Sequence, residues 1–152
     1  MAAHVSAELG ALVSGVKVVS PTLLSATVET ANVVEVAQKV NSLGFDHVKS
    51  VTAIDFEQEN KIDMVYHISS FLNVELAQVI FELRTSIARQ DPKIHSLIGV
   101  WPSAEYPERE TLDLMGVTFD GLPQKERLFL LDNFEGFPLR KDFKLKTEGT
   151  DA

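Results

Sequence analysis

Hydrophobic residues recur every three or four positions in residues 32–44, NVVEVAQKVNSLG. The apolar positions of this segment are Val33, Val36, Val40 and Leu43. This spacing places them on one face of a helix. Asn32 is suited to cap the first turn together with Glu35, and Gly44 is suited to end the helix in a left-handed conformation. The pattern predicts a helix that packs by one face.

Runs of β-branched and aromatic residues predict strands on both sides of this helix. One run is residues 23–29, LLSATVE, and residues 47–71 contain two more around the polar turn EQEN at 57–60. Residues 93–101, KIHSLIGVW, predict another strand, and LFLL at 128–131 is strand-like. Short strands separated by turns are typical of a sheet-based domain.

Residues 75–89, ELAQVIFELRTSIAR, fit either secondary structure. Positions that alternate as in a strand are Ala77, Val79, Phe81 and Leu83. Positions that fit one helical face are Leu76, Val79, Ile80, Leu83 and Ile87. We favour a strand that continues the preceding hairpin.

A second helix is predicted over residues 103–116, SAEYPERETLDLMG. Ser103 is a candidate cap, Pro107 is tolerated only in the first turn, and Gly116 can end the helix. We therefore expect an α+β (mixed α/β) fold in which a single sheet is packed by two main helices. One domain over residues 1–152 would end in an extended C-terminal tail at 134–152.

Composition excludes several classes of protein. The chain has 152 residues and no cysteine, which removes disulfides, thiolate zinc sites and cysteine-ligated iron–sulfur clusters. The net charge of -8 argues against nucleic acid as a partner. No apolar run reaches the roughly 18–20 residues that span a bilayer, and the first residues lack the basic region of a secretory signal. We expect a soluble intracellular protein, held at a membrane only by a partner.

Candidate chemistry is sparse. The four histidines (His4, His47, His67 and His95) are scattered, and neither a phosphate-binding glycine loop nor a G-x-S-x-G elbow is present. Glu110 and Asp113 stand three positions apart and are conceivable as an acid–base pair, but Arg109 is placed to form a surface pair with Asp113 instead. We expect no metal, no cofactor and no catalytic residue on this chain.

The C-terminal segment FPLRKDF at 137–143 combines basic and aromatic residues. Arg140 is suited to bind a carboxylate through two hydrogen bonds, and Phe137 and Phe143 are suited to anchor in pockets. Composition leaves open whether this segment lies along its own sheet or on a partner.

Two stretches of the sequence resemble the signature of the C subunit of proton-pumping NADH:quinone oxidoreductase, complex I. They are SAEYPERETLDLMGVTFDG at 103–121 and DNFEGFPLRKDF at 132–143. The matching positions are Ala104, Glu108, Arg109, Glu110, Asp113, Gly116, Gly121, Pro123, Arg127, Gly136, Pro138, Leu139, Arg140, Lys141, Asp142 and Phe143. The resemblance covers nearly the whole chain.

This resemblance implies a non-catalytic subunit of the peripheral arm, without a flavin, cluster or nucleotide of its own. The implied partners are the large subunit of the quinone module, which resembles that of nickel–iron hydrogenases, the iron–sulfur subunits and, through them, the membrane-arm subunits. A flavin or deazaflavin, iron–sulfur clusters and a quinone-type acceptor would lie elsewhere in the complex. The implied location is peripheral, on the cytoplasmic side of the cell membrane, with the tail wrapped around the large subunit.

Departures from the family pattern leave the electron donor, the acceptor and the pumped ion open. Leu112 stands where complex I members commonly have Tyr, and Met115 replaces a common Phe. The same signature occurs in deazaflavin-dependent dehydrogenases that reduce a phenazine or quinone, and in energy-converting nickel–iron hydrogenases. Two alternatives of another class are an independent enzyme built on Glu110 and its neighbouring carboxylates, and a stand-alone anion-binding module. The basic residues of such a module would be Arg140, Lys141 and Lys144.

Overall fold

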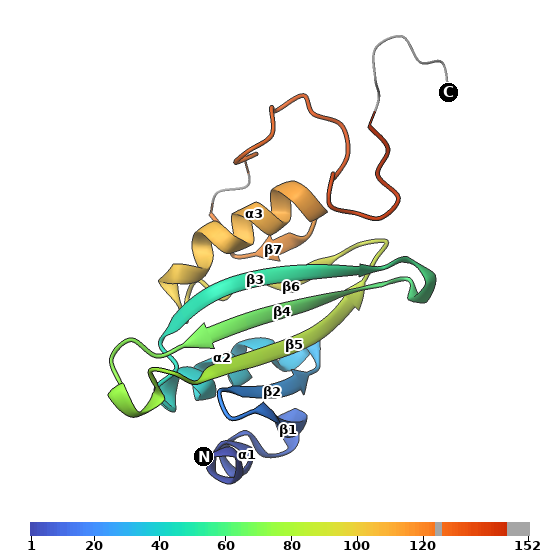
Figure 1. Cartoon of the computed structure of the whole chain (residues 1–152). Coiled ribbons are helices and arrows are strands. Elements are labelled where there is room, and N and C mark those ends of the chain that lie inside the picture. Colours follow the sequence, from blue (N-terminus) through green and yellow to red (C-terminus); the bar gives the residue numbers. More distant parts are fainter. Residues whose placement is uncertain (124–125, 146–152) are drawn as a thin grey trace.

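A five-stranded sheet forms the centre of the computed structural model, which describes residues 1–123 and 126–145 (Figure 1). Its strand order is β1-β2-β5-β4-β3. The strands are β1 (Val13–Ser20), β2 (Leu23–Val28), β3 (His47–Phe56), β4 (Lys61–Ser69) and β5 (Ile80–Ala88). Neighbours are antiparallel except β2 and β5, which run parallel because α2 and the β3–β4 hairpin lie between them in sequence.

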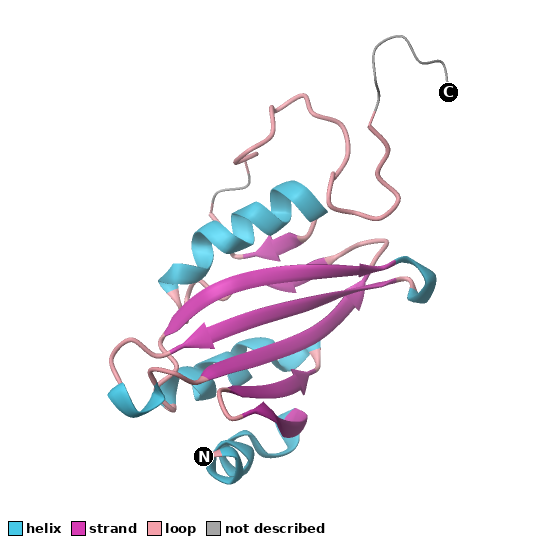
Figure 2. Ribbon diagram, in the orientation of Figure 1, coloured by secondary structure: helices cyan, strands magenta, loops and turns pink. Residues whose placement is uncertain are grey.

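Three α-helices and a second, two-stranded sheet complete the described part of the chain (Figure 2). The helices are α1 (Ala2–Leu9), α2 (Val33–Ser42) and α3 (Glu105–Met115). The small sheet pairs β6 (Lys93–His95) in parallel with β7 (Thr118–Asp120). α1 lies beside β1 at one edge of the large sheet, and α3 lies beside β3 at the other. No helix in residues 1–123 and 126–145 is long and apolar enough to cross a membrane.

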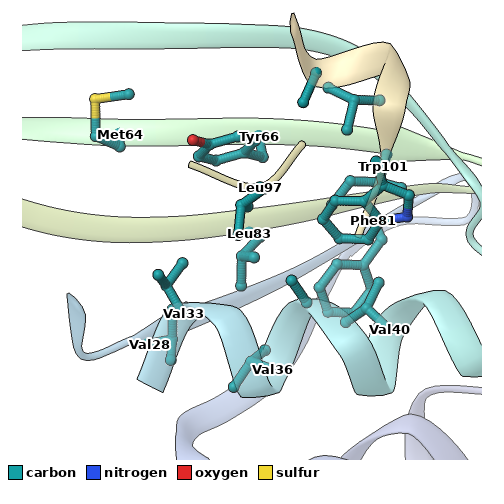
Figure 3. Packing of buried hydrophobic residues seen from close by; sticks show 14 of the residues in the cluster. Val28, Val33, Val36, Val40, Met64, Tyr66, Phe81, Leu83, Leu97 and Trp101 are labelled. Carbon is teal, nitrogen blue, oxygen red and sulfur yellow. The ribbon is translucent and has the colours of Figure 1, made fainter. Parts of the chain in front are cut away.

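The hydrophobic core lies on one face of the large sheet (Figure 3). Alternate residues of β4 and β5 point into it, and they meet the valines of α2. The residues labelled in Figure 3 are Val28, Val33, Val36, Val40, Met64, Tyr66, Phe81, Leu83, Leu97 and Trp101. Trp101 is fully buried and donates its indole N–H to the carbonyl of Phe45 at 2.9 Å. The other face of the sheet carries the polar members of the same strands.

Most sequence predictions of secondary structure are confirmed. The mixed α+β class, helix α2, the β3–β4 hairpin and β2 form as expected, and residues 75–89 contain strand β5, which begins at Ile80. Gly44 follows α2 with φ 109, and Gly116 ends α3 with φ 75. The part of the predicted tail at 146–152 lies outside the described residues.

Several local predictions are wrong. The side chain of Asn32 forms no cap on α2, and Ser103 Oγ accepts a hydrogen bond from the amide of Val48 instead of capping α3. Only Lys93–His95 of the predicted strand at 93–101 is extended, and it belongs to the second sheet rather than to a single one. Residues 128–131 form no strand, because the amides of the first three donate to a side-chain carboxylate instead.

Candidate functional site

Glu108 of α3 is fully buried where this helix meets the sheet. Its Oε1 accepts hydrogen bonds from Tyr66 Oη at 3.1 Å and from the amide of Leu97 at 2.8 Å, and its Oε2 accepts one from Ser96 Oγ at 2.5 Å. Burial raises the pKa of Glu108, although these three bonds act in the opposite direction. The side chain therefore joins α3 to β4 and to the loop after β6.

Asp113, five residues further along α3, holds the segment that follows the small sheet. Its Oδ2 accepts the backbone amides of Leu128, Phe129 and Leu130 at 3.2, 2.7 and 3.1 Å. Its Oδ1 lies 3.2 Å from Nη1 of Arg127. Burial would raise the pKa of Asp113, but the amides and the guanidinium outweigh it, and the pKa lies below its usual value. We call the segment that Asp113 holds, residues 126–145, the C-terminal strap.

The strap then passes over the end of α3. The ring of Phe137 lies against Gly116, and the amide of Leu139 donates to the carbonyl of Leu114 at 3.1 Å. Arg140 Nε donates to the carbonyl of Met115 at 2.7 Å. Carbonyls in the last turn of a helix lack partners within the helix, so these contacts satisfy two of them. Arg140 therefore binds the helix end, and it makes no two-pronged contact with a carboxylate of residues 1–123 or 126–145.

The last contact of the strap is with the far end of β3 and β5. Arg89 donates Nε to Asp55 Oδ1 at 2.6 Å and Nη2 to Asp55 Oδ2 at 3.1 Å, and its Nη2 also lies 3.1 Å from Asp142 Oδ1. The amide of Lys141 donates to Asp55 Oδ2 at 3.0 Å. The bond from Arg89 is the main cause that lowers the pKa of Asp55. Sequence reasoning missed Asp55 and Arg89, because 34 and 86 residues separate Asp55 from its partners Arg89 and Lys141.

Glu110 and Asp113, which the sequence left conceivable as a carboxylate pair, do not face one another. Asp113 faces the strap with both oxygens, whereas Glu110 is exposed and lines a separate cavity of about 190 Å³ between β3 and α3. Arg109 does not pair with Asp113. Its guanidinium lies 5.5 Å from the ring centroid of Tyr106. The structure thus gives the candidate acid–base residues no common site.

The remaining signature positions shape turns of the chain. Gly121 has φ 90 and Gly136 has φ 89, both in the left-handed region that glycine tolerates. Pro123 lies in the turn after β7, and Pro138 is half-buried in the strap. Among residues 1–123 and 126–145, no group of three or more side chains is arranged to hold a metal ion.

The strap also exposes apolar side chains. Four of its large hydrophobic side chains are at least 61% exposed: Phe129, Leu131, Leu139 and Leu145. Polar contacts thus fix the strap to the domain, while these four apolar side chains remain exposed among polar ones. Exposed hydrophobic side chains that gather on one ordered segment mark a protein interface.

Comparison with known proteins agrees with this picture. Residues 26–149 match the family of the 30 kDa subunit of respiratory-chain NADH dehydrogenase. The chain is 42% identical over 106 residues to the C subunit of the NADH-quinone oxidoreductase of Moorella thermoacetica, covering 70% of this chain and 69% of the relative. It is 35% identical over 127 residues to the C subunit of the F(420)H(2) dehydrogenase of Methanosarcina mazei, covering 82% of this chain and 78% of the relative.

Two solved structures share the fold. One is a chain of the membrane-bound sulfane sulfur reductase, an archaeal respiratory membrane complex, with a TM-score of 0.82 and 26% identity. That match covers 94% of this chain and 83% of the other. The trypsin-resistant fragment of Nqo5 matches with a TM-score of 0.62 at 21% identity, over 72% of this chain and 87% of the fragment.

Proposed function

The chain belongs to the family of the 30 kDa subunit of respiratory-chain NADH dehydrogenase, and on this premise we propose that it is the C subunit of a membrane-bound, ion-translocating oxidoreductase of the NADH:quinone type. Its relatives are C subunits of NADH-quinone oxidoreductases and of an F(420)H(2) dehydrogenase. In this proposal the chain is a non-catalytic subunit of the peripheral arm. It docks on the hydrogenase-like large subunit, on the cytoplasmic side of the cell membrane.

The C-terminal strap is the observation that supports this role most directly, because it is held on the domain and exposes apolar side chains. Asp113, Gly116, Arg140 and Asp55 fix its inner side to the domain before any partner binds. A segment that is already ordered loses less conformational entropy on docking, so more of the apolar burial contributes to affinity. The exposed Leu131 and Leu145 are the side chains that we assign to pockets of the large subunit.

The redox groups belong in this proposal to other subunits. The chain has no cysteine, so it offers no thiolate ligand for an iron–sulfur cluster. We accordingly place the clusters on neighbouring chains, together with the flavin or deazaflavin and the quinone-type acceptor. The contribution of this subunit is to assemble the large subunit with the iron–sulfur subunits.

A second candidate is the same subunit in a deazaflavin-dependent dehydrogenase. The 35% identity to the C subunit of the F(420)H(2) dehydrogenase extends over 82% of this chain, as does the 35% identity to the corresponding NADH-quinone oxidoreductase subunit of a Roseiflexus species. The two candidates differ in the electron-input module. Oxidation of NADH or of the reduced deazaflavin by the purified complex distinguishes them.

The test is recovery of the complex through this chain. An amino-terminally tagged chain, purified from solubilised membranes of its own organism, is expected to bring down a hydrogenase-like large subunit, iron–sulfur subunits and membrane-arm chains. Leu131→Gln combined with Leu145→Gln should reduce that recovery, because both side chains are exposed and their replacement leaves the fold intact. Val18→Thr, at a 61% exposed position of β1, is the matched control.

Each outcome bears on one part of the proposal. Recovery of the tagged chain alone, from the soluble fraction, would show that it is not a subunit of such a complex. Full recovery of the complex with the strap variant would show that the docking surface does not include Leu131 and Leu145 of the strap.

A further inference from the structure

A cavity of about 430 Å³ opens on the face of the large sheet that is opposite the core. Its lining residues are Ser20, Thr22, Leu23, Lys49, Ser50, His67 and Ile80. The register of the sheet shows which face this is, because Ser50 pairs with His67 while their neighbours Val51 and Tyr66 point the other way. Its volume falls within the roughly 300–1,000 Å³ of small-ligand sites. The cavity takes no part in the strap or its contacts.

Two β-bulges flank this cavity. The register of β3 against β4 shifts between Val48 and Ser50, and that of β1 against β2 shifts between Val18 and Ser20. In a regular strand, consecutive side chains point to opposite faces. Lys49 and Ser50 nevertheless line the same cavity, since a bulge redirects a side chain. Both distortions thus direct polar groups to one place.

A hydrogen-bonded chain of side chains orients the floor of the cavity. Ser50 Oγ lies 3.2 Å from His67 Nδ1, and His67 Nε2 lies 3.0 Å from Glu82 Oε2. Glu82 Oε1 accepts a bond from Ser25 Oγ at 3.0 Å and lies 2.9 Å from Arg84 Nε. The contact with His67 fixes the position of Ser50 Oγ at the cavity.

The other donors come from the β1–β2 turn and from the bulge in β3. The amide of Thr22 donates to Ser20 Oγ at 3.3 Å, and the two hydroxyl oxygens lie 3.4 Å apart. Lys49 is exposed, and its ammonium forms no ion pair within residues 1–123 and 126–145. In the same part of the chain, no acidic side chain lines the cavity. The hydroxyl donors and the Lys49 ammonium therefore meet no negative charge among the described lining residues.

We propose that this cavity binds a small molecule through an oxyanion, a phosphate or carboxylate group held by the Lys49 ammonium and the hydroxyls of Ser20, Thr22 and Ser50. Charge-assisted hydrogen bonds from an ammonium and from hydroxyls are the usual means of holding such a group. Leu23 and Ile80 supply the apolar wall for the rest of the ligand. His67 and Glu82 are positioning residues, which hold Ser50 in place without touching the ligand.

The full chain is titrated with inorganic phosphate and, separately, with succinate, at constant ionic strength set with chloride. Amide shifts in nuclear magnetic resonance spectra are followed at Ser20, Thr22, Leu23, Lys49, Ser50 and Ile80. We expect saturable shifts there with roughly millimolar affinity for at least one anion. The anion that saturates the site identifies the group that it takes.

Two variants decide whether the designated residues hold the anion. Lys49→Ala should weaken binding roughly tenfold, the loss of one charge-assisted hydrogen bond. Lys93→Ala, at a lysine of β6 whose side chain is 56% exposed and which does not line the cavity, should leave it unchanged. Retained dispersion of the other amide signals shows that each variant is folded. Shifts that fail to saturate with both anions overturn the proposal, and so does an equal loss with both variants, which would indicate non-specific attraction.

Discussion

A Cβ atom on Gly116 would lie 2.6 Å from Cε2 of Phe137, closer than any side chain can approach. Gly116 also has φ 75, in the left-handed region, where it ends α3. The guanidinium groups of Arg127 and Arg140 lie 5.0 and 5.3 Å from the centroid of the Phe137 ring. The absence of a side chain at residue 116 is therefore what lets the strap close over the helix end.

Gly116→Ala should loosen the strap and destabilise the protein. A left-handed non-glycine residue costs about 1–2 kcal/mol, and the new methyl group must displace the Phe137 ring. Urea denaturation gives the free energy of unfolding, and limited proteolysis gives the rate of cleavage within residues 126–145. Gly99→Ala is the control, since a Cβ at Gly99 meets nothing within 4 Å. Equal behaviour of the two variants would contradict the role of Gly116.

The core elements could be predicted from the sequence because their signals are local. The helical spacing of Val33, Val36 and Val40 and the turn between β3 and β4 both lie within a few residues of the elements they define. The same reasoning wrongly predicted a strand at residues 128–131. Their apolar run is typical of a strand, but the amides of this run bind the carboxylate of Asp113, which no pattern within the run indicates.

The candidate site was predictable only in part for the same reason. Resemblance to a family signature singled out Glu108, Asp113 and Arg140, but not what they touch. Asp55 lies just before the polar turn at 57–60, where charged side chains are usually solvated, yet it is only 3% exposed and binds both Arg89 and the strap. Such contacts depend on chain segments that the fold brings together over long separations.

Asp113→Asn should weaken the strap in a pH-dependent way. At neutral pH the Asp113 carboxylate accepts hydrogen bonds from Arg127 and from the amides of 128–130. Removing one partner of a buried ion pair lowers the free energy of unfolding by about 3–5 kcal/mol. The folded pKa of Asp113 is lowered, so its stabilisation is present above the unfolded pKa of roughly 3.9 and is lost as pH falls further. The difference in unfolding free energy between variant and parent, measured at several pH values, should shrink below pH ~4. If the difference in unfolding free energy stayed constant across these pH values, the charge of Asp113 would not be the source of the stabilisation.

Glu108→Gln should show the opposite trend. Burial raises the folded pKa of Glu108, so the folded state holds this proton more tightly than the unfolded state. The parent therefore loses stability as pH rises above the unfolded pKa of roughly 4.3, whereas the uncharged variant does not. Glutamine also retains acceptors for Tyr66 and Leu97. In urea denaturation, the free energy of unfolding of the variant should rise relative to that of the parent as the pH is raised from 4 to 7. A relative loss over this range would rule out the assigned direction of the pKa.

Arg89→Lys should lower the thermal stability of the protein more than Asp142→Asn does. The Arg89 fork donates two hydrogen bonds to the buried Asp55, and a lysine ammonium cannot reproduce that planar geometry. Asp142 is 51% exposed at its side chain, so its ion pair with Arg89 is partly screened by water and salt. Thermal unfolding should rank the variants in that order, and raising the salt concentration should reduce the effect of Asp142→Asn. Both variants should speed proteolysis of the strap, because Asp55 also accepts the amide of Lys141. The reverse ranking would mean that Asp142, rather than Asp55, is the main partner of Arg89.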